Sequence, residues 1–259
     1  MDNAKSASEA KHWIAQLSHY LDYAYGSQQL EGFKSLGEFV KETFPESAQA
    51  ALVLLPTSYL SPKPLYDLLK GFETDLDFSS HSDSFPIRDE SSLETYASRV
   101  AGTVAESCIE LVYHHTSVSI SKEEMERIVH AGGRMGIALQ LVNIARDIAV
   151  DARISRVYLP TTWLKEKGLT PEDIIKSPET AQVEGLRQRV IVEAMDIYRE
   201  ARGAIELLPK EGRGPMRVAV ESYMEIGRTL RKPSYKVKAG RATVPKMRRL
   251  AVAWSALSG

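Results

Sequence analysis

Cysteine, long apolar runs and net charge are all scarce in this sequence, and each shortage excludes a class of protein. The single cysteine, Cys108, permits neither an intrachain disulfide nor a cysteine-based zinc site, which favours a reducing compartment. No stretch reaches the ~18 apolar residues of a membrane span, and the polar N-terminus lacks the apolar core of a signal peptide. A net charge of −1 gives no general attraction to nucleic acid. We therefore expect an intracellular protein, cytoplasmic or peripheral to a membrane, without a nucleic-acid partner.

Strand signals are scarce as well. Most of the chain has helical periodicity, whereas alternating β-branched runs between hairpin turns are few. Neither of two loop-like stretches, residues 79–92 and 169–178, resembles a domain linker, so we predict one all-α domain over residues 1–259. The expected helices are 7–25, 36–43, 48–55, 64–77, 93–114, 122–152, 179–208, 216–230 and 244–256.

Basic residues accumulate near the C-terminus, with few acids between them. A solvated basic face would explain them, and attraction to an anionic substrate or membrane surface is the alternative. Peripheral membrane association through Lys236, Lys238 and Arg241 is therefore a hypothesis. The oligomeric state is left open.

The expected helix 122–152 carries the main candidate site. Ser121 is a natural N-cap that fixes its start. At about 100° per residue, one face gathers polar side chains within an arc of about 80°. These are Gln140, Asn143, Asp147 and Asp151. Gly132 and Gly136 extend the same stripe, where the missing side chains leave room for a bulky ligand.

An acidic pair one helical turn apart is common on solvated helices, but Asp147 has mainly apolar neighbours in sequence. An unpaired carboxylate is costly to bury there, and a cation would remove that cost. Magnesium prefers oxygen ligands and bridges carboxylates to phosphate groups. Arg146, Arg153 and Arg156 could clamp phosphate oxygens, or could simply pair with surface acids.

Residues 140–160, QLVNIARDIAVDARISRVYLP, closely resemble the second aspartate-rich signature of the squalene and phytoene synthase family, particularly its fungal-type phytoene synthase domains. Further blocks resemble the family in the same order. They are PLYDLLKGFETDL with Gly71 and Asp75, YASRVAGTVAES from Tyr96, Tyr223 followed by Ile226, and GRATVPKMRRL at 240–250.

The resemblance implies an isoprenoid-synthase-type helical bundle around a central cavity. It implies head-to-head condensation of two geranylgeranyl diphosphates to phytoene, as in carotenoid biosynthesis. Asp147 and Asp151 would hold Mg²⁺ or Mn²⁺, with Gln140, Asn143 and Asp75 in the substrate site. Tyr96, Val100, Ala101 and Gly102 would lie along the prenyl chains, and Tyr96 and Tyr223 could stabilise positive charge.

One departure from the family pattern concerns the first aspartate-rich motif, D-D/E-x-x-D. Met1 and Asp2 match its last two places, so only Asp2 would remain as a metal ligand and the preceding helices would be missing. This predicts a fragment, a shortened gene model or part of a longer bifunctional protein, with little activity on its own. The alternatives are an inactive fragment, a non-catalytic helical assembly or binding protein, and a squalene-type synthase using farnesyl diphosphate.

Overall fold

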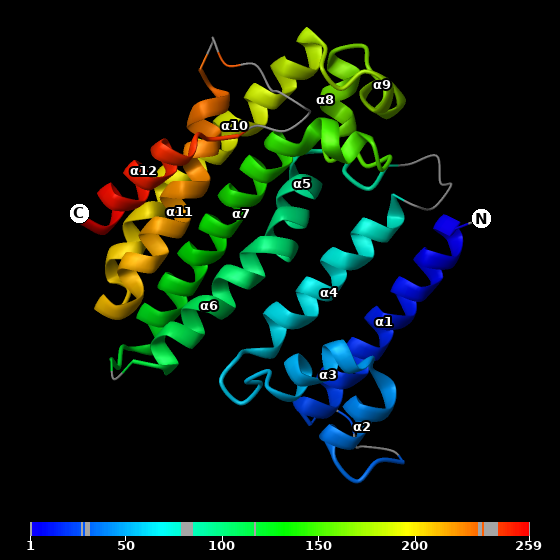
Figure 1. Cartoon of the computed structure of the whole chain (residues 1–259), viewed down its shortest axis with the longest axis vertical. Helices are drawn as coiled ribbons and strands as arrows, with labels where there is room; N and C mark the ends of the chain where they lie inside the picture. Colours follow the sequence, from blue (N-terminus) through cyan, green and yellow to red (C-terminus); the bar gives the residue numbers. More distant parts are fainter. Residues whose placement is uncertain are drawn as a thin grey trace.

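The computed structural model describes residues 2–26, 28, 32–78, 85–116, 118–232, 235 and 243–258, without the side chains of residues 2–6. Within these ranges every regular element is a helix, which confirms the predicted all-α class (Figure 1). The elements are α1 (Asp2–Ala24), α2 (Leu36–Thr43), α3 (Glu46–Val53), α4 (Pro62–Asp77), α5 (Glu90–Ala97), η1 (Ser98–Gly102), α6 (Thr103–His114), α7 (Lys122–Ala152), α8 (Thr161–Glu166), α9 (Pro171–Lys176), α10 (Ala181–Ala201), η2 (Arg202–Leu207), α11 (Lys210–Leu230) and α12 (Lys246–Ser258). None of the described helices is long and apolar enough to cross a membrane.

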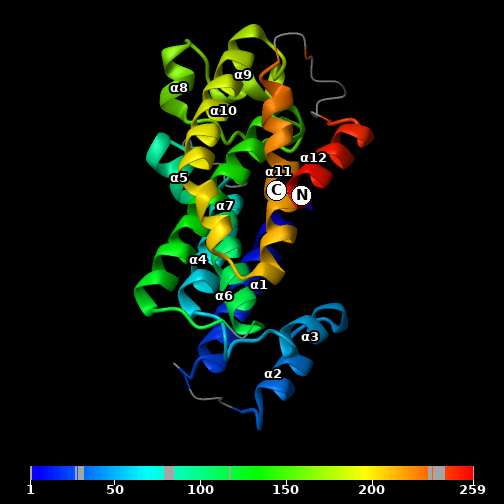
Figure 2. The same ribbon diagram turned by 90° about the vertical axis from the view of Figure 1, so that its left-hand side faces the viewer.

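Helix α7 is the central element of the fold. The Ser121 hydroxyl accepts a hydrogen bond from the Glu124 backbone amide at 3.2 Å, and the helix has the predicted bounds. In Figure 1, α7 runs between α10 to α12 on one side and α4 and α1 on the other, and it contacts η1, α6, α10 and α11 directly. Figure 2 shows that α2 and α3 lie at the opposite end of the molecule from α8 and α9.

Several local structures differ from the sequence-based expectation, among them α8, which was not predicted, and η2, which replaces the end of the predicted helix 179–208. The predicted helix 93–114 is interrupted by a π-helical turn at Ser98–Gly102. The predicted loop 169–178 contains α9, because Thr170 and Asp173 form a capping box and Pro171 occupies the first turn. Helix α11 begins at Lys210, so Pro215 lies inside it rather than just before it.

The apolar side chains form two clusters. The larger one lies around α7, and the smaller one is built by α1 to α4 around Tyr20, Phe39 and Phe44. Helix α4 contacts both α1 and η1, and therefore joins the clusters. The prediction of one domain over residues 1–259 remains a prediction.

Glycines allow η1 and α6 to approach α7 closely. A Cβ atom at Gly136 would lie 2.4 Å from the Ala101 carbonyl oxygen, and one at Gly132 would lie 2.0 Å from Ile109 Cδ1. We expected the space at these glycines to be left for a ligand. Much of it is instead taken by the neighbouring helical segment.

We predict that Gly136→Ala lowers the free energy of unfolding by about 1–3 kcal/mol, because the added methyl group meets backbone that cannot rotate away. Gly185→Ala in α10 is the matched control, since a Cβ there meets nothing within 4 Å. Urea denaturation of both variants tests this. Equal stability of Gly136→Ala and the parent protein would contradict the close packing.

Candidate active site

Arg146 and Asp147 form a buried ion pair on α7, each with 9% of its surface exposed. Arg146 Nε donates to Asp147 Oδ1 at 2.9 Å, and an Arg146 guanidinium nitrogen also donates to Asn143 Oδ1. Tyr223 of α11 covers this pair, because its ring centre lies 5.7 Å from the Arg146 guanidinium carbon. Its hydroxyl lies 3.4 Å from Asn143 Oδ1. The predicted residues of α7 and α11 are therefore brought together.

A second cluster surrounds Asp75 of α4. The hydroxyls of Tyr96 and Tyr158 each donate to Asp75 Oδ1 at 2.9 Å. Arg156 Nη1 lies 3.3 Å from Asp75 Oδ2. The two tyrosine rings are stacked with their centres 5.0 Å apart. Three chain segments thus converge on one carboxylate.

Asp151 links the two clusters electrostatically. Burial raises its pKa to about 7, and the charges of Asp147 and, more weakly, Asp75 add to this, while Arg156 opposes it. Burial likewise raises the pKa of Tyr158 to about 12 and the pKa of Tyr96 further. Both phenols therefore keep their protons at neutral pH and remain hydrogen-bond donors to Asp75.

The donor set of this wall suits a hard divalent cation. Asp147 and Asp151 lie one turn apart, and a cation between them would lower the raised pKa of Asp151. No group of three or more His, Cys, Asp or Glu side chains within the described ranges converges on one metal position. Magnesium would accordingly keep waters or phosphate oxygens as its other ligands, as it commonly does. The side chain of Asp2 lies outside the described residues.

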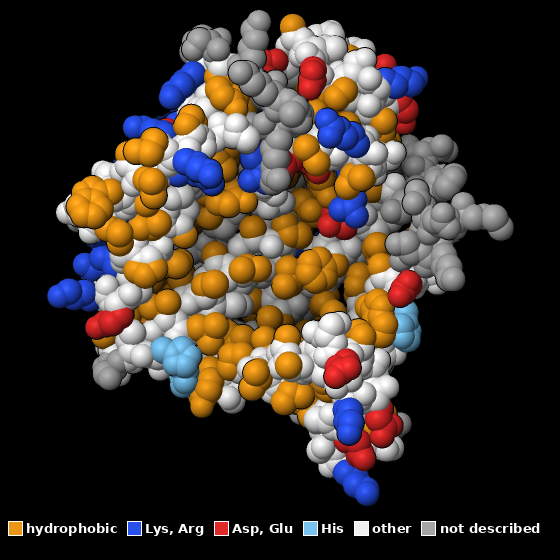
Figure 3. Space-filling view, in the orientation of Figure 1, with side chains coloured by type: hydrophobic (Ala, Val, Ile, Leu, Met, Phe, Trp, Pro, Cys, Tyr) orange, Lys and Arg blue, Asp and Glu red, His pale blue; other side chains and the backbone are white. Residues whose placement is uncertain are grey.

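An apolar cavity of about 290 Å³ lies along α7 on the N-terminal side of this polar wall. Val100 and Ala101 line it, together with Gly136, Cys108 and Val220. Gly102 does not, because its α-carbon faces the Gly133 backbone instead. The wall of the cavity thus follows the glycine stripe predicted on α7. Figure 3 shows that the face of the molecule seen there is hollowed in its middle and lined largely by hydrophobic side chains.

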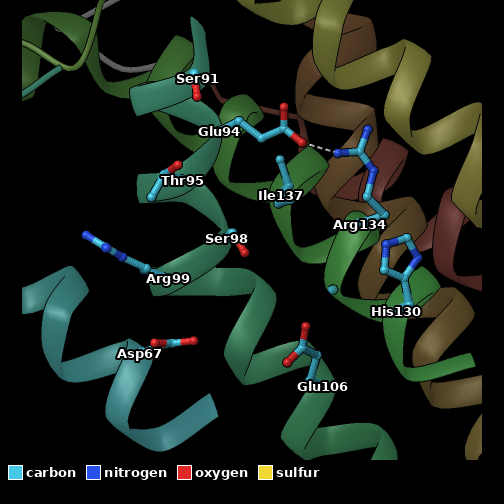
Figure 4. Close-up of a pocket in the computed structure, with 11 residues that line it drawn as sticks. Asp67, Ser91, Glu94, Thr95, Ser98, Arg99, Glu106, His130, Arg134 and Ile137 are labelled. Atoms are coloured by element: carbon cyan, nitrogen blue, oxygen red, sulfur yellow. Dashed lines mark hydrogen bonds and ion pairs between the residues drawn. The ribbon is translucent and has the colours of Figure 1, made fainter. Parts of the chain in front are cut away.

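A polar cavity of about 440 Å³ shares no lining residue with the apolar one. Figure 4 shows Glu94 bonded to Arg134, whereas Arg99 points away from both. Asp67 is bonded to Lys63 and Lys70 on its own helix. Glu94, Arg134 and Asp67 therefore have ionic partners, and burial raises the pKa of Glu106, which lines the same cavity.

Comparison with known proteins identifies the family. Residues 1–248 match squalene/phytoene synthase. The chain belongs to the squalene/phytoene synthase family. It is 52% identical over 258 residues to a bifunctional lycopene cyclase/phytoene synthase of Gibberella fujikuroi and 53% identical over 258 residues to one of Phaeosphaeria nodorum. Both matches cover 100% of this chain but only 44% and 43% of the relatives, so the chain spans less than half of their length.

Two solved structures of low sequence identity share the fold. A dehydrosqualene synthase crystal structure superimposes with a TM-score of 0.66 at 21% identity, covering 98% of this chain and 87% of that one. A squalene synthase, HpnC from Alicyclobacillus acidocaldarius, gives 0.58 at 17% identity, covering 83% of this chain and 79% of that one. The predicted isoprenoid-synthase-type bundle is confirmed.

The remaining predicted residues of this squalene/phytoene synthase domain have different surroundings. Gln140 is half-buried on α7, whereas Arg153 is exposed at the C-terminal end of that helix. Arg156 contacts Asp75, a site acid, rather than a surface acid. Tyr158 was missed by the sequence analysis, although it lies in the recognised 140–160 string. Its position beside Tyr96 depends on tertiary packing.

We predict that Tyr158→Phe lowers the free energy of unfolding by about 1–2 kcal/mol, because Asp75 loses a donor to its charged form. Tyr59→Phe serves as the control, since that side chain is 52% exposed. Thermal and urea unfolding measure the difference. If both variants unfold like the parent protein, the hydrogen bond from Tyr158 to Asp75 contributes nothing to the free energy of unfolding.

Proposed function

We propose that this domain condenses two geranylgeranyl diphosphates head to head to give phytoene, using Mg²⁺ or Mn²⁺. The observation that carries this proposal is the arrangement on α7, where a paired-aspartate wall continues directly into an apolar cavity. Such a site would take a substrate with an anionic head and a long apolar tail. The relatives named as lycopene cyclase/phytoene synthases support phytoene as the product.

Asp147 and Asp151 would hold the metal at the diphosphate end of the site. When bound, the metal supplies charge neutralisation for the departing diphosphate. Arg146 is placed to add positive charge there, while its present contacts with Asp147 and Asn143 fix its orientation. Arg156 lies beside Asp151 and can act in the same way.

The apolar cavity would shield the reacting carbons from water. Loss of diphosphate from one substrate would give an allylic cation, which adds to the double bond of the second substrate. Loss of a proton from the resulting cation would then close the three-membered ring of a cyclopropylcarbinyl diphosphate. A second ionisation, rearrangement and proton loss then yield phytoene. Tyr223 presents an aromatic ring beside the polar wall, where it can stabilise positive charge.

Two rival functions give different products in the same assay. A squalene-type synthase would prefer farnesyl diphosphate, and squalene itself also requires a reductive step. A non-catalytic helical protein would form no product. Two preparations separate these functions: the chain extended by its natural flanking sequence, and the chain alone. Each is incubated with Mg²⁺ and with either prenyl diphosphate, and the products are identified. Absence of phytoene from both preparations would overturn the proposal.

Asp147→Asn and Asp151→Asn should each lower phytoene formation on the order of a hundredfold, because each removes a charged oxygen ligand. Chelation of the divalent metal should abolish product formation. Glu126→Gln is the control, because its side chain is 66% exposed at the start of α7. Full activity of both aspartate variants would exclude the paired-aspartate wall as the metal site.

Cys108 offers a test of substrate binding that does not require turnover. It lines the apolar cavity, is exposed and is the only cysteine, so a thiol-specific maleimide labels this position alone. Geranylgeranyl diphosphate with Mg²⁺ should slow its labelling several-fold. In a Cys108→Ser/Ser91→Cys variant, which moves the thiol to the polar cavity, labelling should be unaffected. Protection of the new thiol instead would place the prenyl chain in the polar cavity and contradict the proposal.

A further inference from the structure

Helix α12 carries an apolar stripe that faces away from the protein. Met247, Leu250, Trp254 and Leu257 are 76%, 63%, 75% and 59% exposed. Their spacing of three, four and three residues places them within an arc of about 80°. The opposite face, which includes the buried Ala256, packs on α11. The stripe is therefore not covered by the fold within the described residues.

The orientation of α12 is fixed by a buried carboxylate. Glu225 of α11 is only 1% exposed, and its Oε1 accepts a hydrogen bond from Arg248 Nε at 2.7 Å. Arg228 Nη1 lies 3.5 Å from the other carboxylate oxygen. Removing Arg248 would leave part of a buried charge uncompensated, which is strongly unfavourable. This ion pair holds the apolar stripe outward.

All charged side chains of α12 are basic. The helix contains no Asp or Glu, and Lys246, Arg248 and Arg249 lie in its first turn. Cations are unfavourable at the N-terminal end of a helix dipole, so helix stability does not explain them there. Lys246 and Arg249 are exposed, and on the helix both lie to one side of the apolar stripe. An external anionic surface complements this arrangement.

We propose that α12 docks on the surface of a bilayer containing anionic lipids. The four apolar side chains enter the boundary between headgroups and acyl chains, and the basic first turn contacts lipid phosphates. Trp254 suits this boundary because its ring is apolar and its N–H is polar. Figure 3 shows hydrophobic side chains gathered over α12 at the left edge, with Lys and Arg side chains beside them.

Docking through α12 would bring the candidate site close to its lipid substrate. Helix α11, on which α12 packs, also carries Tyr223 and lines the apolar cavity through Val220. Only this delivery of a prenyl diphosphate rests on the proposed function. The docking itself is measured without substrate, so its failure would leave the proposed reaction untouched. Lys236, Lys238 and Arg241, which the sequence suggested for membrane contact, lie outside the described residues.

The test is cosedimentation of the whole chain with vesicles of phosphatidylcholine mixed with phosphatidylserine. Leu250→Gln/Trp254→Gln should reduce binding about tenfold or more, and Lys246→Gln/Arg249→Gln should weaken it and reduce its salt dependence. Val53→Gln/Leu54→Gln is the matched control, because these side chains are 58% and 77% exposed at the C-terminal end of α3. The control should bind like the parent protein.

Tryptophan emission gives a second readout that is independent of sedimentation. Binding should shift emission to shorter wavelengths, and Trp254→Phe should remove the shift while most binding is retained. Equal binding of the parent protein and the stripe variant would overturn the proposal. The proposal would also be overturned if the parent protein were a dimer that does not bind vesicles and the Leu250→Gln/Trp254→Gln variant were a monomer. The stripe would then bind a second copy of the chain. Equal binding to pure phosphatidylcholine would overturn the requirement for anionic lipid.

Discussion

The close approach of α7 to η1 is the constraint on which the rest of this structure depends. The backbone contact at Gly136 and Ala101 is possible only because no side chain stands between them. It fixes the rotation of α7, and with it the directions of Asp147 and Asp151 further along the same helix. The contact also separates the apolar cavity from the polar one, since Gly133 faces the polar side and Gly136 the apolar side. A single helix pair therefore determines both the position of the charged wall and the shape of the apolar cavity.

The charged wall combines two ways of holding a partly buried carboxylate. Asp75 is neutralised within the protein by donors from Tyr96, Tyr158 and Arg156. Asp151 has no comparable set of donors among the residues that the structure describes, and burial raises its pKa to about 7. The first arrangement is complete without a ligand, whereas the second is favoured by an added cation. This difference supports the proposal that metal and diphosphate bind at the Asp151 end of the wall, while Asp75 orders the tyrosines around it.

Local patterns in the sequence predicted α7 well. They could not predict contacts between segments that lie far apart in the chain. The bounds of α7 followed from Ser121 and a long periodic run, and the shared face of Asn143 and Asp147 followed from helix geometry. The pairing of Arg146 with Asp147 was not predicted, because adjacent residues on a helix normally diverge and only the length of arginine allows the contact. Tyr158 was missed for a related reason. Its stacking on Tyr96 joins segments far apart in the chain, and no periodicity encodes that contact.

Helix α11 links the candidate site to α12 at the surface of the protein, because its two faces carry Tyr223 and Glu225. Tyr223 and Glu225 are two residues apart, which places them about 200° apart around the helix axis. Tyr223 consequently faces Asn143 and Arg146, while Glu225 faces Arg248 of α12. Because Glu225 is buried and paired, rotation of α11 would separate a charged contact on one side as it moved Tyr223 on the other. The two faces of α11 are thus mechanically linked, and the position of the aromatic ring at the candidate site depends on how α12 is seated.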